Sequence, residues 1–455
     1  MHSPIARLLI ASCAGKLLVL LIVYSLNPDR IVAGDTASYE NPARALMSTG
    51  RFVSNLDEPD RVETLRTPGY PAFLAAVFFV SSGSHLAVAV TQIGISTATL
   101  WLLYVLAARL WNAQIAMVCA VLFAVDLLSF VYASLLHTET LYTFAIVVLV
   151  LAGVTLLQGL SVRWALAFAT AAACATLARP IAYFLFLPSL GAILLQGTLA
   201  GQGMRRVAAV ALVAVLPWIV LVEGWRLRNY VLTGRAEIAQ IAAVNLLWYR
   251  GAGIIAVRDQ ISFDEARDRI ARSLPDTTGW SPGAVSAYYE REGLRLIVSH
   301  PGLFLRNQLY GALKVLAGPG RADLLHYFAG VPYEDAPDGA VDVSVPLLRQ
   351  RLVSGPLWGL IPLAFATTYL VLLYACALLG VWEVVREEKA RWVSHAFVGW
   401  VLLYHVLVAA GPEAYARFRV PIMPLLALYA GRGAIVAVAR LAEKPFFMRP
   451  SKSRV

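Results

Sequence analysis

Ten apolar stretches, most of them about as long as a lipid bilayer is thick, constrain this chain more than any other feature. A transmembrane helix needs about 20 consecutive apolar residues. The stretches are 7–26, 86–108, 113–132, 141–158, 162–178, 180–197, 206–224, 358–382, 394–411 and 420–440. Of the 455 residues, 59% are apolar and 15% are charged, whereas soluble domains have about 45–50% and about 25%. We therefore predict an all-α polytopic membrane protein and exclude disordered, disulfide-rich secreted and ordinary cytosolic proteins.

Basic residues between these stretches predict which loops face the cytoplasm, because cytoplasmic loops are enriched in Lys and Arg. With the N-terminus inside, the loops and tail on that side contain Arg109, Arg163, Arg205, Arg206, Arg386, Lys389, Arg391, Lys444, Arg449, Lys452 and Arg454. Both termini are then cytoplasmic. We expect an N-terminal transmembrane catalytic module (1–224, with a first outer loop at 27–85), a periplasmic, mostly helical segment (225–357) and C-terminal transmembrane helices with a short tail (358–455).

Two shorter apolar stretches, 67–83 and 301–317, do not fit this alternation. If 67–83 crossed the membrane, every later loop would change sides and the basic loops would lie outside. We therefore predict that 67–83 is an interfacial or re-entrant helix, and the same question applies to 301–317. Helix-start signals at 262–265 (a capping box) and at 281–282 (Ser-Pro) predict that the segment 225–357 is helical.

The net charge of +10 would suggest a nucleic-acid partner in a soluble protein. Here the basic residues are scattered between apolar stretches, and no stripe pairs them with stacking aromatic residues. Loop orientation and anionic lipids explain the excess better, so we expect contact with membrane lipids and no nucleic acid. Only five of the 38 basic residues are Lys. Arg binds phosphate in a bidentate fork, although genome composition explains a high share of Arg equally well.

Polar side chains concentrate in the turns that are predicted to lie outside. Asp35 follows the first span, and Tyr39 lies four residues later, on the same face if this stretch is helical. Arg66 stands beside a Thr-Pro-Gly turn, on the side where basic residues are disfavoured. An anionic ligand outside would account for this arginine, and ion pairing with nearby acids is the structural alternative.

Later turns add charged groups to the same side. Glu139, beside His137 at the mouth of the fourth span, is either a solvated helix start or an acid that completes a site with Asp35. Arg179 lies between two apolar runs, where it pairs, faces a polar cavity or extends to the interface. Further candidates follow the seventh span or precede the last one: Arg228, Tyr415, Arg417 and Arg419. Arginines from distant segments at one membrane boundary fit a lipid-linked phosphate.

Asp126 lies inside the third predicted span, where an acid is a functional candidate by default. Its place near the outer end, beside Ser129, favours a local hydrogen bond instead. The sequence contains no nucleotide-phosphate loop, HExxH or G-x-S-x-G motif, and its four cysteines lie in apolar runs without metal-ligand spacing. An activated donor that resides in the membrane therefore fits better than a cytosolic nucleotide.

Six segments, in order, resemble those of the integral-membrane GT-C glycosyltransferases: GDTASYENPARALMSTGRF, RTPGYPAFLA, HTETLYTF, LARPIA, RNYVLTG with NLLWYRG, and EAYARFRVPIMP. They extend from residue 34 to residue 424. The chain is most similar to bacterial enzymes that depend on polyprenyl-phosphate sugars, related to protein O-mannosyltransferases and the lipid A aminoarabinose transferase. The resemblance implies a GT-C-like bundle of about 10–12 transmembrane helices with helical periplasmic loops. It also implies sugar transfer from a polyprenyl-phosphate donor to a lipid, glycan or protein on the periplasmic face.

The resemblance also implies roles for single residues. Asp35 matches a catalytic acid of the first outer loop and would act as the base, with Glu139 as its supporting acid. Four arginines match positions that hold the donor phosphate and stabilise its leaving charge: Arg66, Arg179, Arg228 and Arg419. The remaining candidates for substrate binding are Tyr39, His137, Tyr415 and Arg417.

One departure concerns the donor and the cofactor. The aminoarabinose group has a Glu-Lys-Pro-type motif where this chain has Arg66-Thr67-Pro68. That difference disfavours an aminoarabinose donor and a metal bound through that Glu. His137 could orient a carboxylate or help to bind a divalent metal, so we expect no certain cofactor and leave a divalent metal open.

A transporter or flippase of lipid-linked glycan is the competing interpretation, since it too would have outer arginines and an intramembrane acid. Transporters often contain internal repeats with broken helices in matching halves. This sequence shows no such repeat, and its polar residues gather outside the membrane rather than at its middle. A glycan polymerase or ligase would carry its main polar loop later in the chain. We therefore favour the transferase.

Overall fold

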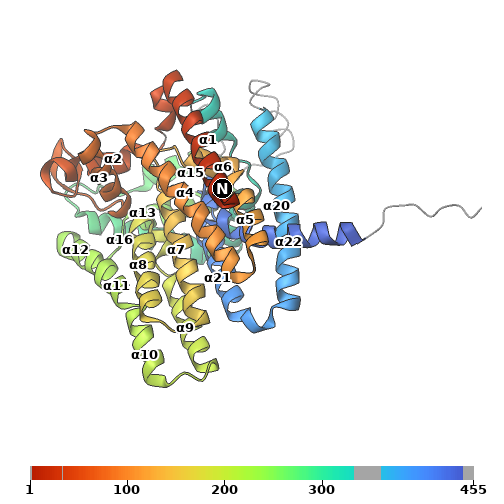
Figure 1. The fold of residues 1–455 in the computed structure, drawn as a ribbon. Helices are drawn as coiled ribbons and strands as arrows, with labels where there is room; N and C mark the ends of the chain where they lie inside the picture. Colours follow the sequence, from red (N-terminus) through yellow and green to blue (C-terminus); the bar gives the residue numbers. More distant parts are fainter. Residues whose placement is uncertain (1–2, 33, 333–359, 444–455) are drawn as a thin grey trace, which may run out of the picture.

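The structure, a computed structural model, describes residues 3–32, 34–332 and 360–443. Its regular structure is almost entirely helical (Figure 1). The first half contains α1 (Pro4–Leu26), α2 (Thr36–Thr49), α3 (Gly69–Ser81), α4 (His85–Leu110), α5 (Ala113–Ala124), α6 (Leu127–Tyr132), α7 (Glu139–Gln158), α8 (Val162–Ala178), α9 (Phe186–Leu199), α10 (Met204–Val213), α11 (Leu216–Trp218) and α12 (Gly224–Thr233). The second half contains α13 (Ile241–Val244), α14 (Ala252–Asp259), α15 (Phe263–Ser273), α16 (Pro282–Ser299), α17 (Pro301–Ala317), α18 (Arg321–Leu324), α20 (Leu360–Glu387), α21 (Trp392–Ala409) and α22 (Met423–Glu443).

Short 3₁₀ or π-helical segments connect or extend these helices: η1 (Pro28–Ile31), η2 (Pro180–Ala182), η3 (Ile219–Glu223), η4 (Asn245–Gly251), η5 (Leu325–Ala329), η8 (Lys389–Arg391) and η9 (Ala416–Ile422). The predictions for 333–357 and for the basic C-terminal tail fall outside the described residues. In Figure 1, α2 and α3 lie at one end of the bundle, and the turn between α9 and α10 lies at the other.

Eight helical stretches in the described part of the chain are long and apolar enough to cross a membrane: Pro4–Leu26, His85–Leu110, Glu139–Gln158, Pro180–Leu199, Met204–Thr233, Ile361–Glu387, Lys389–Ala409 and Ala416–Ala442. Each overlaps one of the ten predicted spans. The chain is therefore an all-α polytopic membrane protein, as predicted. The other two predicted spans form shorter apolar helices, α5 and α8.

The predicted span 113–132 is wrong as a continuous helix. The structure ends α5 at Ala124 and starts α6 at Leu127. Between them, the Asp126 carboxylate Oδ2 accepts a hydrogen bond from the Ser129 backbone N at 2.8 Å. A carboxylate that caps a new helix in this way ends the preceding one, so the local hydrogen bond favoured for Asp126 is confirmed.

The stretch 67–83 forms α3, which has 13 residues. At 1.5 Å per residue it is about 20 Å long, shorter than the hydrocarbon core of about 30 Å. Tyr70, Leu74 and Phe78 are each fully buried, at 0% exposure, because α3 packs between α2 and α4. The other doubtful stretch, 301–317, forms α17 and is not among the eight long apolar helices of the described residues.

The first outer loop contains a β-hairpin where the prediction had only helical loops. Strand β1 (Val53–Asn55) pairs antiparallel with β2 (Glu58–Val62). Gly50 ends α2 with a left-handed φ of 69°, a conformation that glycine adopts without steric cost. Pro59 lies within β2, and a proline cannot continue a helix from its interior. These two residues explain why the chain forms a hairpin here.

Both helix starts predicted in the segment after α12 are confirmed. Ser262 caps α15, and its Oγ accepts a hydrogen bond from the Glu265 backbone N at 3.1 Å. Ser281 caps α16 in the same way, through the Ala284 backbone N at 3.2 Å. These caps satisfy backbone N–H groups that a helix start leaves without a partner.

Helix α7 forms the centre of the bundle. Sixteen of its 20 residues are buried, and it packs against α4, α8, α21 and η9. Its first residue is Glu139. The most deeply buried helix of the core therefore fixes the position of one of the two predicted site carboxylates.

Two glycines let α20 and α22 cross in direct backbone contact. A Cβ atom added to Gly433 would overlap the carbonyl oxygen of Cys376, and one added to Gly380 would overlap that of Tyr429. Small residues at a crossing allow this close approach between membrane helices. The pair α20 and α22 is the most extensively packed pair of helices in the described part of the chain.

We predict that Gly433→Ala destabilises the protein by about 1–3 kcal/mol, because the added methyl group forces α20 and α22 apart. Thermal unfolding of the detergent-solubilised protein measures the effect. Gly191→Ala is the matched control, since a Cβ at Gly191 in α9 meets no atom within 4 Å. Equal unfolding temperatures for the two variants would contradict the close crossing.

Candidate functional site

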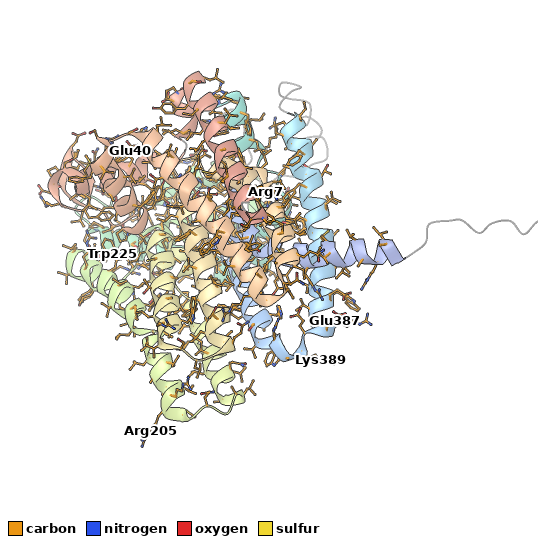
Figure 2. The ribbon with its side chains drawn as sticks, in the orientation of Figure 1. Arg7, Glu40, Arg205, Trp225, Glu387 and Lys389 are labelled. Carbon is orange, nitrogen blue, oxygen red and sulfur yellow. The ribbon has the colours of Figure 1, made fainter. Side chains whose placement is uncertain are left out.

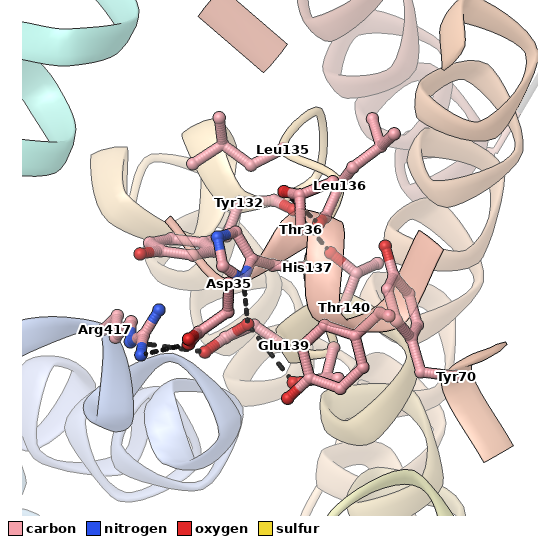
Figure 3. A network of polar contacts seen from close by, with 12 residues as sticks. Asp35, Thr36, Tyr70, Tyr132, Leu135, Leu136, His137, Glu139, Thr140 and Arg417 are labelled. Carbon is pink, nitrogen blue, oxygen red and sulfur yellow. Dashed lines mark hydrogen bonds and ion pairs between the residues drawn. The ribbon is translucent and has the colours of Figure 1, made fainter. Parts of the chain in front are cut away.

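Asp35, Glu139 and Arg417 meet at one end of the bundle, although they come from distant parts of the sequence (Figure 3). Asp35 directly precedes α2, Glu139 begins α7, and Arg417 lies in η9. Gly34 has a φ of 41°, in the left-handed region that favours glycine, and it turns the chain into α2 at Asp35. The structure therefore brings the two predicted acids together.

The turn that precedes α7 is fixed to the segment that carries Asp35. The Leu136 backbone N donates to the Ile31 carbonyl at 2.9 Å, and the Thr36 hydroxyl donates to the Leu136 carbonyl at 3.0 Å. The Gln92 side chain of α4 donates to the Leu135 carbonyl at 2.6 Å. Buried backbone groups require such partners, so these bonds hold the two acid-bearing segments side by side.

Arg417 joins the two carboxylates. Its Nη2 donates to Asp35 Oδ2 at 2.8 Å, and its Nε lies 4.0 Å from Glu139 Oε1. The second distance is that of an ion pair but is too long for a hydrogen bond. Nε is buried and has no hydrogen-bond partner among the described residues. Arg417 thus presents one buried donor that a further acceptor in the site would satisfy.

Arg66 holds the other side of Asp35. Its Nη2 donates to Asp35 Oδ1 at 3.0 Å, and its Nη1 donates to the Tyr39 hydroxyl at 3.0 Å. Its Nε donates to the Ser38 hydroxyl at 3.0 Å. Arg66 and Tyr39 therefore belong to the cluster; the proximity of Tyr39 to Asp35 was predicted from its spacing, whereas the contact of Arg66 with Asp35 was not. Ser38, three residues after Asp35, was not predicted, although its spacing places it beside that residue on α2.

Arg179 pairs with the buried carboxylate of Glu139. Its Nη1 donates to Glu139 Oε1 at 2.9 Å, and its guanidinium carbon lies 5.2 Å from the centre of the Phe418 ring. His137 lies on the other side of the same carboxylate, with Nδ1 4.0 Å from Glu139 Oε2. Of the alternatives for Arg179, the structure shows pairing with an acid.

The cluster combines one accessible carboxylate with one buried carboxylate. The Asp35 side chain is 36% exposed, whereas that of Glu139 is 1% exposed. Burial alone would raise the pKa of Asp35, but the guanidinium groups of Arg417 and Arg66 outweigh it and hold this pKa well below its usual range. Burial lowers the pKa of His137 to about 4, although the Glu139 carboxylate acts in the opposite direction. His137 is therefore neutral at pH 7.

Arg228 and Arg419 make their described contacts elsewhere. Arg228 donates to the carbonyls of Glu63 and Phe52, at 3.0 and 3.2 Å, and so fastens the hairpin to α12. Arg419 is 1% exposed, and its Nη1 lies within 3.0 Å of three carbonyl oxygens at the end of α17. Carbonyls at a helix end need such donors. The geometry therefore gives no support to either arginine as a phosphate ligand.

Three further residues lie around Arg417: Tyr132, Asp323 and Tyr415. The Tyr132 hydroxyl donates to Asp323 Oδ1 at 2.7 Å, and the charge of Asp323 acts on Arg417. Asp323 was not predicted, because nothing in its local sequence relates it to Tyr132, which lies 191 positions earlier. Tyr415 lies beside the cluster, with its ring centre 5.7 Å from the guanidinium carbon of Arg417.

The donor set of the cluster does not suit a metal ion. In the part of the chain that the structure describes, no group of three or more His, Cys, Asp or Glu side chains is arranged to hold one. Asp35 and Glu139 already face the guanidinium groups of Arg66, Arg179 and Arg417. A divalent cation would have to displace these charges or lie against them, so we assign it no role.

The lowered pKa of His137 predicts acid sensitivity. A folded-state pKa of about 4 lies below the unfolded value of about 6.5, so the unfolded chain binds more protons between these pH values. The contribution of His137 is therefore intact above pH 6.5 and is lost as the pH falls toward 4. At about 1.4 kcal/mol for each tenfold change in proton affinity, the loss reaches about 3 kcal/mol.

We predict that His137→Gln removes this part of the pH dependence. Thermal unfolding of both proteins in detergent between pH 7.5 and pH 4.5 measures it, with His300→Gln as a control for the loss of an imidazole outside the cluster. Parallel pH profiles for the wild type and His137→Gln would contradict a buried, neutral His137.

Known proteins match this chain in fold and not in sequence. No family model and no curated protein matches it. An oligosaccharyltransferase from Archaeoglobus fulgidus in the apo form aligns with a TM-score of 0.54 and 14% identity, over 96% of this chain and 51% of its own. The archaeal oligosaccharyltransferase AglB from the same organism, in complex with an inhibitory peptide and a dolichol-phosphate, aligns with a TM-score of 0.50 and 11% identity, over 96% and 52%.

ArnT from Cupriavidus metallidurans, bound to undecaprenyl phosphate, aligns over 95% of this chain and 80% of its own, with 14% identity. Its TM-score is 0.34. The chain spans about half the length of the two oligosaccharyltransferase structures. At these identities the likeness concerns the fold alone, a bundle of membrane helices shared with the two oligosaccharyltransferase structures.

Proposed function

We propose that this protein is a glycosyltransferase of the inner membrane. It transfers a sugar from a polyprenyl-phosphate-linked donor to a lipid, glycan or protein acceptor on the periplasmic face. The observation that carries this proposal is the pair of carboxylates, Asp35 and Glu139, joined by Arg417. The fold supports it, because the similar structures are oligosaccharyltransferases and one of them is a complex with dolichol-phosphate.

The charges of the cluster suit a lipid-linked phosphate. Ion pairs join five side chains, of which three are guanidinium groups and two are carboxylates. These five retain one positive charge, and a phosphodiester between a sugar and a polyprenol carries one negative charge. A phosphate oxygen near Arg417 Nε would satisfy the buried donor that the described residues leave unpaired.

Asp35 is the base in this proposal, since it is the more accessible of the two carboxylates. It takes a proton from the acceptor hydroxyl or amide while the acceptor atom bonds to the anomeric carbon of the sugar. The bond from that carbon to the phosphate oxygen breaks, and its electrons leave with the polyprenyl phosphate. Attack opposite to the leaving group inverts the configuration at the anomeric carbon. Arg66 and Arg417 stabilise the charge that develops on the phosphate.

Donor binding also activates the base. Without a donor, Arg417 and Arg66 hold the pKa of Asp35 well below its usual range, and a carboxylate of such low basicity accepts a proton poorly. A donor phosphate competes with Asp35 for both arginines. As they turn toward the phosphate, the pKa of Asp35 rises toward its ordinary value. Proton removal is thereby coupled to the presence of the donor.

Glu139 acts as a positioning residue. It is buried, and its carboxylate faces Arg179, Arg417 and His137 rather than open space. Its negative charge offsets the cost of burying these arginines and fixes their direction. We therefore refine the role of supporting acid that its sequence position predicts: Glu139 acts through the arginines and not on the acceptor.

We predict that Asp35→Asn lowers donor turnover at least about a hundredfold, because the amide cannot accept the proton. Membranes bearing each variant receive a panel of radiolabelled polyprenyl-phosphate sugars together with endogenous acceptors, and label leaving the lipid fraction is followed. Asp57→Asn is the matched control, since Asp57 is an exposed acid of the same loop. Equal expression and unfolding temperatures confirm folding.

Full turnover in Asp35→Asn would show that another residue is the base, while the proposal of a transferase would still hold. Movement of the labelled lipid across the membrane, without transfer of its sugar in the wild type, would contradict the transferase and favour a flippase. Turnover that stops in both Asp35→Asn and Asp57→Asn would indicate a loop-wide structural effect instead of a base.

We predict that Arg417→Lys lowers kcat/KM by about a hundredfold, because Lys cannot reach Asp35 and the phosphate with one planar fork. Glu139→Gln is expected to lower kcat with a smaller change in KM, since it disturbs the direction of the arginines. Steady-state kinetics with the active donor measures both effects. Arg295→Lys serves as the control, because its side chain is 77% exposed. Unchanged kinetics in Arg417→Lys would exclude this arginine from phosphate stabilisation.

A further inference from the structure

A second binding feature lies at the end of the bundle opposite the Asp35 cluster. Helix α4 connects the two ends: His85 Nε2, at its start, donates a hydrogen bond to Glu40 Oε1 of α2 at 2.8 Å, and the Leu110 carbonyl, at its end, accepts one from Arg391. Its 26 residues correspond to about 39 Å. Figure 2 accordingly shows Glu40 near the top of the molecule and Lys389, in the turn between α20 and α21, near the bottom.

A cavity of about 490 Å³ lies beside this turn, between α20 and α21. Most of its lining is apolar and comes from these two helices: Val381, Val384, Val385, Trp392, Gly399 and Leu402. Val385 is 71% exposed and Trp392 is 52% exposed, so the cavity opens on the outside of the helix bundle. In a membrane protein this surface faces lipid, and a volume of this size falls within the range of small-molecule sites.

The acid and the imidazole in the lining are already engaged. Glu388 accepts hydrogen bonds from the Trp111 indole and from His395 Nε2, the latter at 3.1 Å. The other ring nitrogen of His395 lies 3.3 Å from the Tyr429 hydroxyl. These contacts join the end of α4, the turn that follows α20, and the helices α21 and α22 beside the cavity. They also mean that Glu388 does not require the cavity ligand as a partner.

Lys389 is the cation that remains at the mouth. It is exposed and forms no ion pair or hydrogen bond within residues 3–32, 34–332 and 360–443. The neighbouring acids are neutralised by α22: Glu387 pairs with Arg432, and Glu383 pairs with Arg440. The adjacent Glu388 lies 3.9 Å from the guanidinium group of Arg391, so the Lys389 ammonium group stands without an ion-pair partner among the described residues, next to an apolar interior.

Gly399 of α21 lines the cavity and, having no side chain, leaves space there. A Cβ atom added there would meet no other atom within 4 Å. A larger side chain at this position would extend into the cavity instead of into packed neighbours. Glycine lowers the intrinsic stability of a helix relative to alanine. A glycine at this position therefore costs helix stability and leaves room in the cavity for a ligand.

We propose that this cavity binds an anionic glycerophospholipid, with an acyl chain between α20 and α21 and the phosphate against Lys389. An apolar interior that opens to the bilayer suits an acyl chain, and basic groups between membrane helices bind anionic head groups. The exposed Trp392 also lines the cavity, and tryptophan is enriched where membrane helices meet lipid head groups. A soluble anion fits less well, because it would leave the apolar interior exposed to water.

Lipid binding to the full-length, delipidated protein tests this proposal. Native mass spectrometry in detergent measures apparent affinities for phosphatidylglycerol and for phosphatidylcholine with identical acyl chains. We expect tighter binding of phosphatidylglycerol to the wild type. Lys389→Gln should weaken that lipid about fivefold and leave phosphatidylcholine unchanged, as expected for one basic residue near a lipid surface. Gly399→Leu should reduce the binding of both lipids, because it fills the space for the acyl chain.

Two controls separate this site from general effects. Arg205→Gln removes a basic residue at the same end of the molecule, away from the cavity (Figure 2), and Gly191→Leu adds the same side chain to an open position on α9. Neither should change lipid affinity. Equal affinities of the wild type for the two lipids, or equal losses in Lys389→Gln and Arg205→Gln, would overturn the head-group contact. Wild-type lipid binding in Gly399→Leu would overturn occupancy of the cavity; Lys389→Gln adds no bulk and remains informative if Gly399→Leu misfolds.

Discussion

The charge of the buried Glu139 carboxylate has to be neutralised, and this requirement determines how the segments around the start of α7 are arranged. Glu139 begins the most deeply buried helix and is almost inaccessible, and an unpaired charge in that place would cost several kcal/mol. Arg179 and Arg417 supply the compensating charge. Because they come from the end of α8 and from η9, the pairing requires both segments to end beside α7. Asp35 then joins through Arg417, and Arg66 joins through Asp35.

The fold was predictable to the extent that it depends on apolar length. Ten apolar stretches indicated a bundle of membrane helices, and the eight long helices overlap eight of them. The break at Asp126 and the hairpin after Gly50 were not predicted as structure, because each depends on one or two residues whose effect averages out in a window of about 20. A helix cap or a left-handed glycine acts at one position, whereas mean hydropathy is averaged over a whole window of residues and does not detect it.

The candidate site was predictable in its residue types and only in part in its contacts. The structure brings together five residues that the sequence had placed at one boundary of the membrane: Asp35, Arg66, Glu139, Arg179 and Arg417. Arg228 and Arg419 lie at the same boundary in sequence, yet their guanidinium groups serve backbone carbonyls. Sequence shows that an arginine must find acceptors, but it does not show whether these are carboxylates, carbonyls or a ligand. The function proposed from these residues stays a prediction.

Arg417 and Arg419 stand two residues apart in η9 and are directed to different partners. Arg419 donates hydrogen bonds to carbonyls at the end of α17, whereas Arg417 forms ion pairs with Asp35 and Glu139. Both arginines lie in η9, which the hydrogen bonds of Arg419 attach to the end of α17. The position of the end of α17 therefore helps to determine where Arg417 lies relative to Asp35 and Glu139.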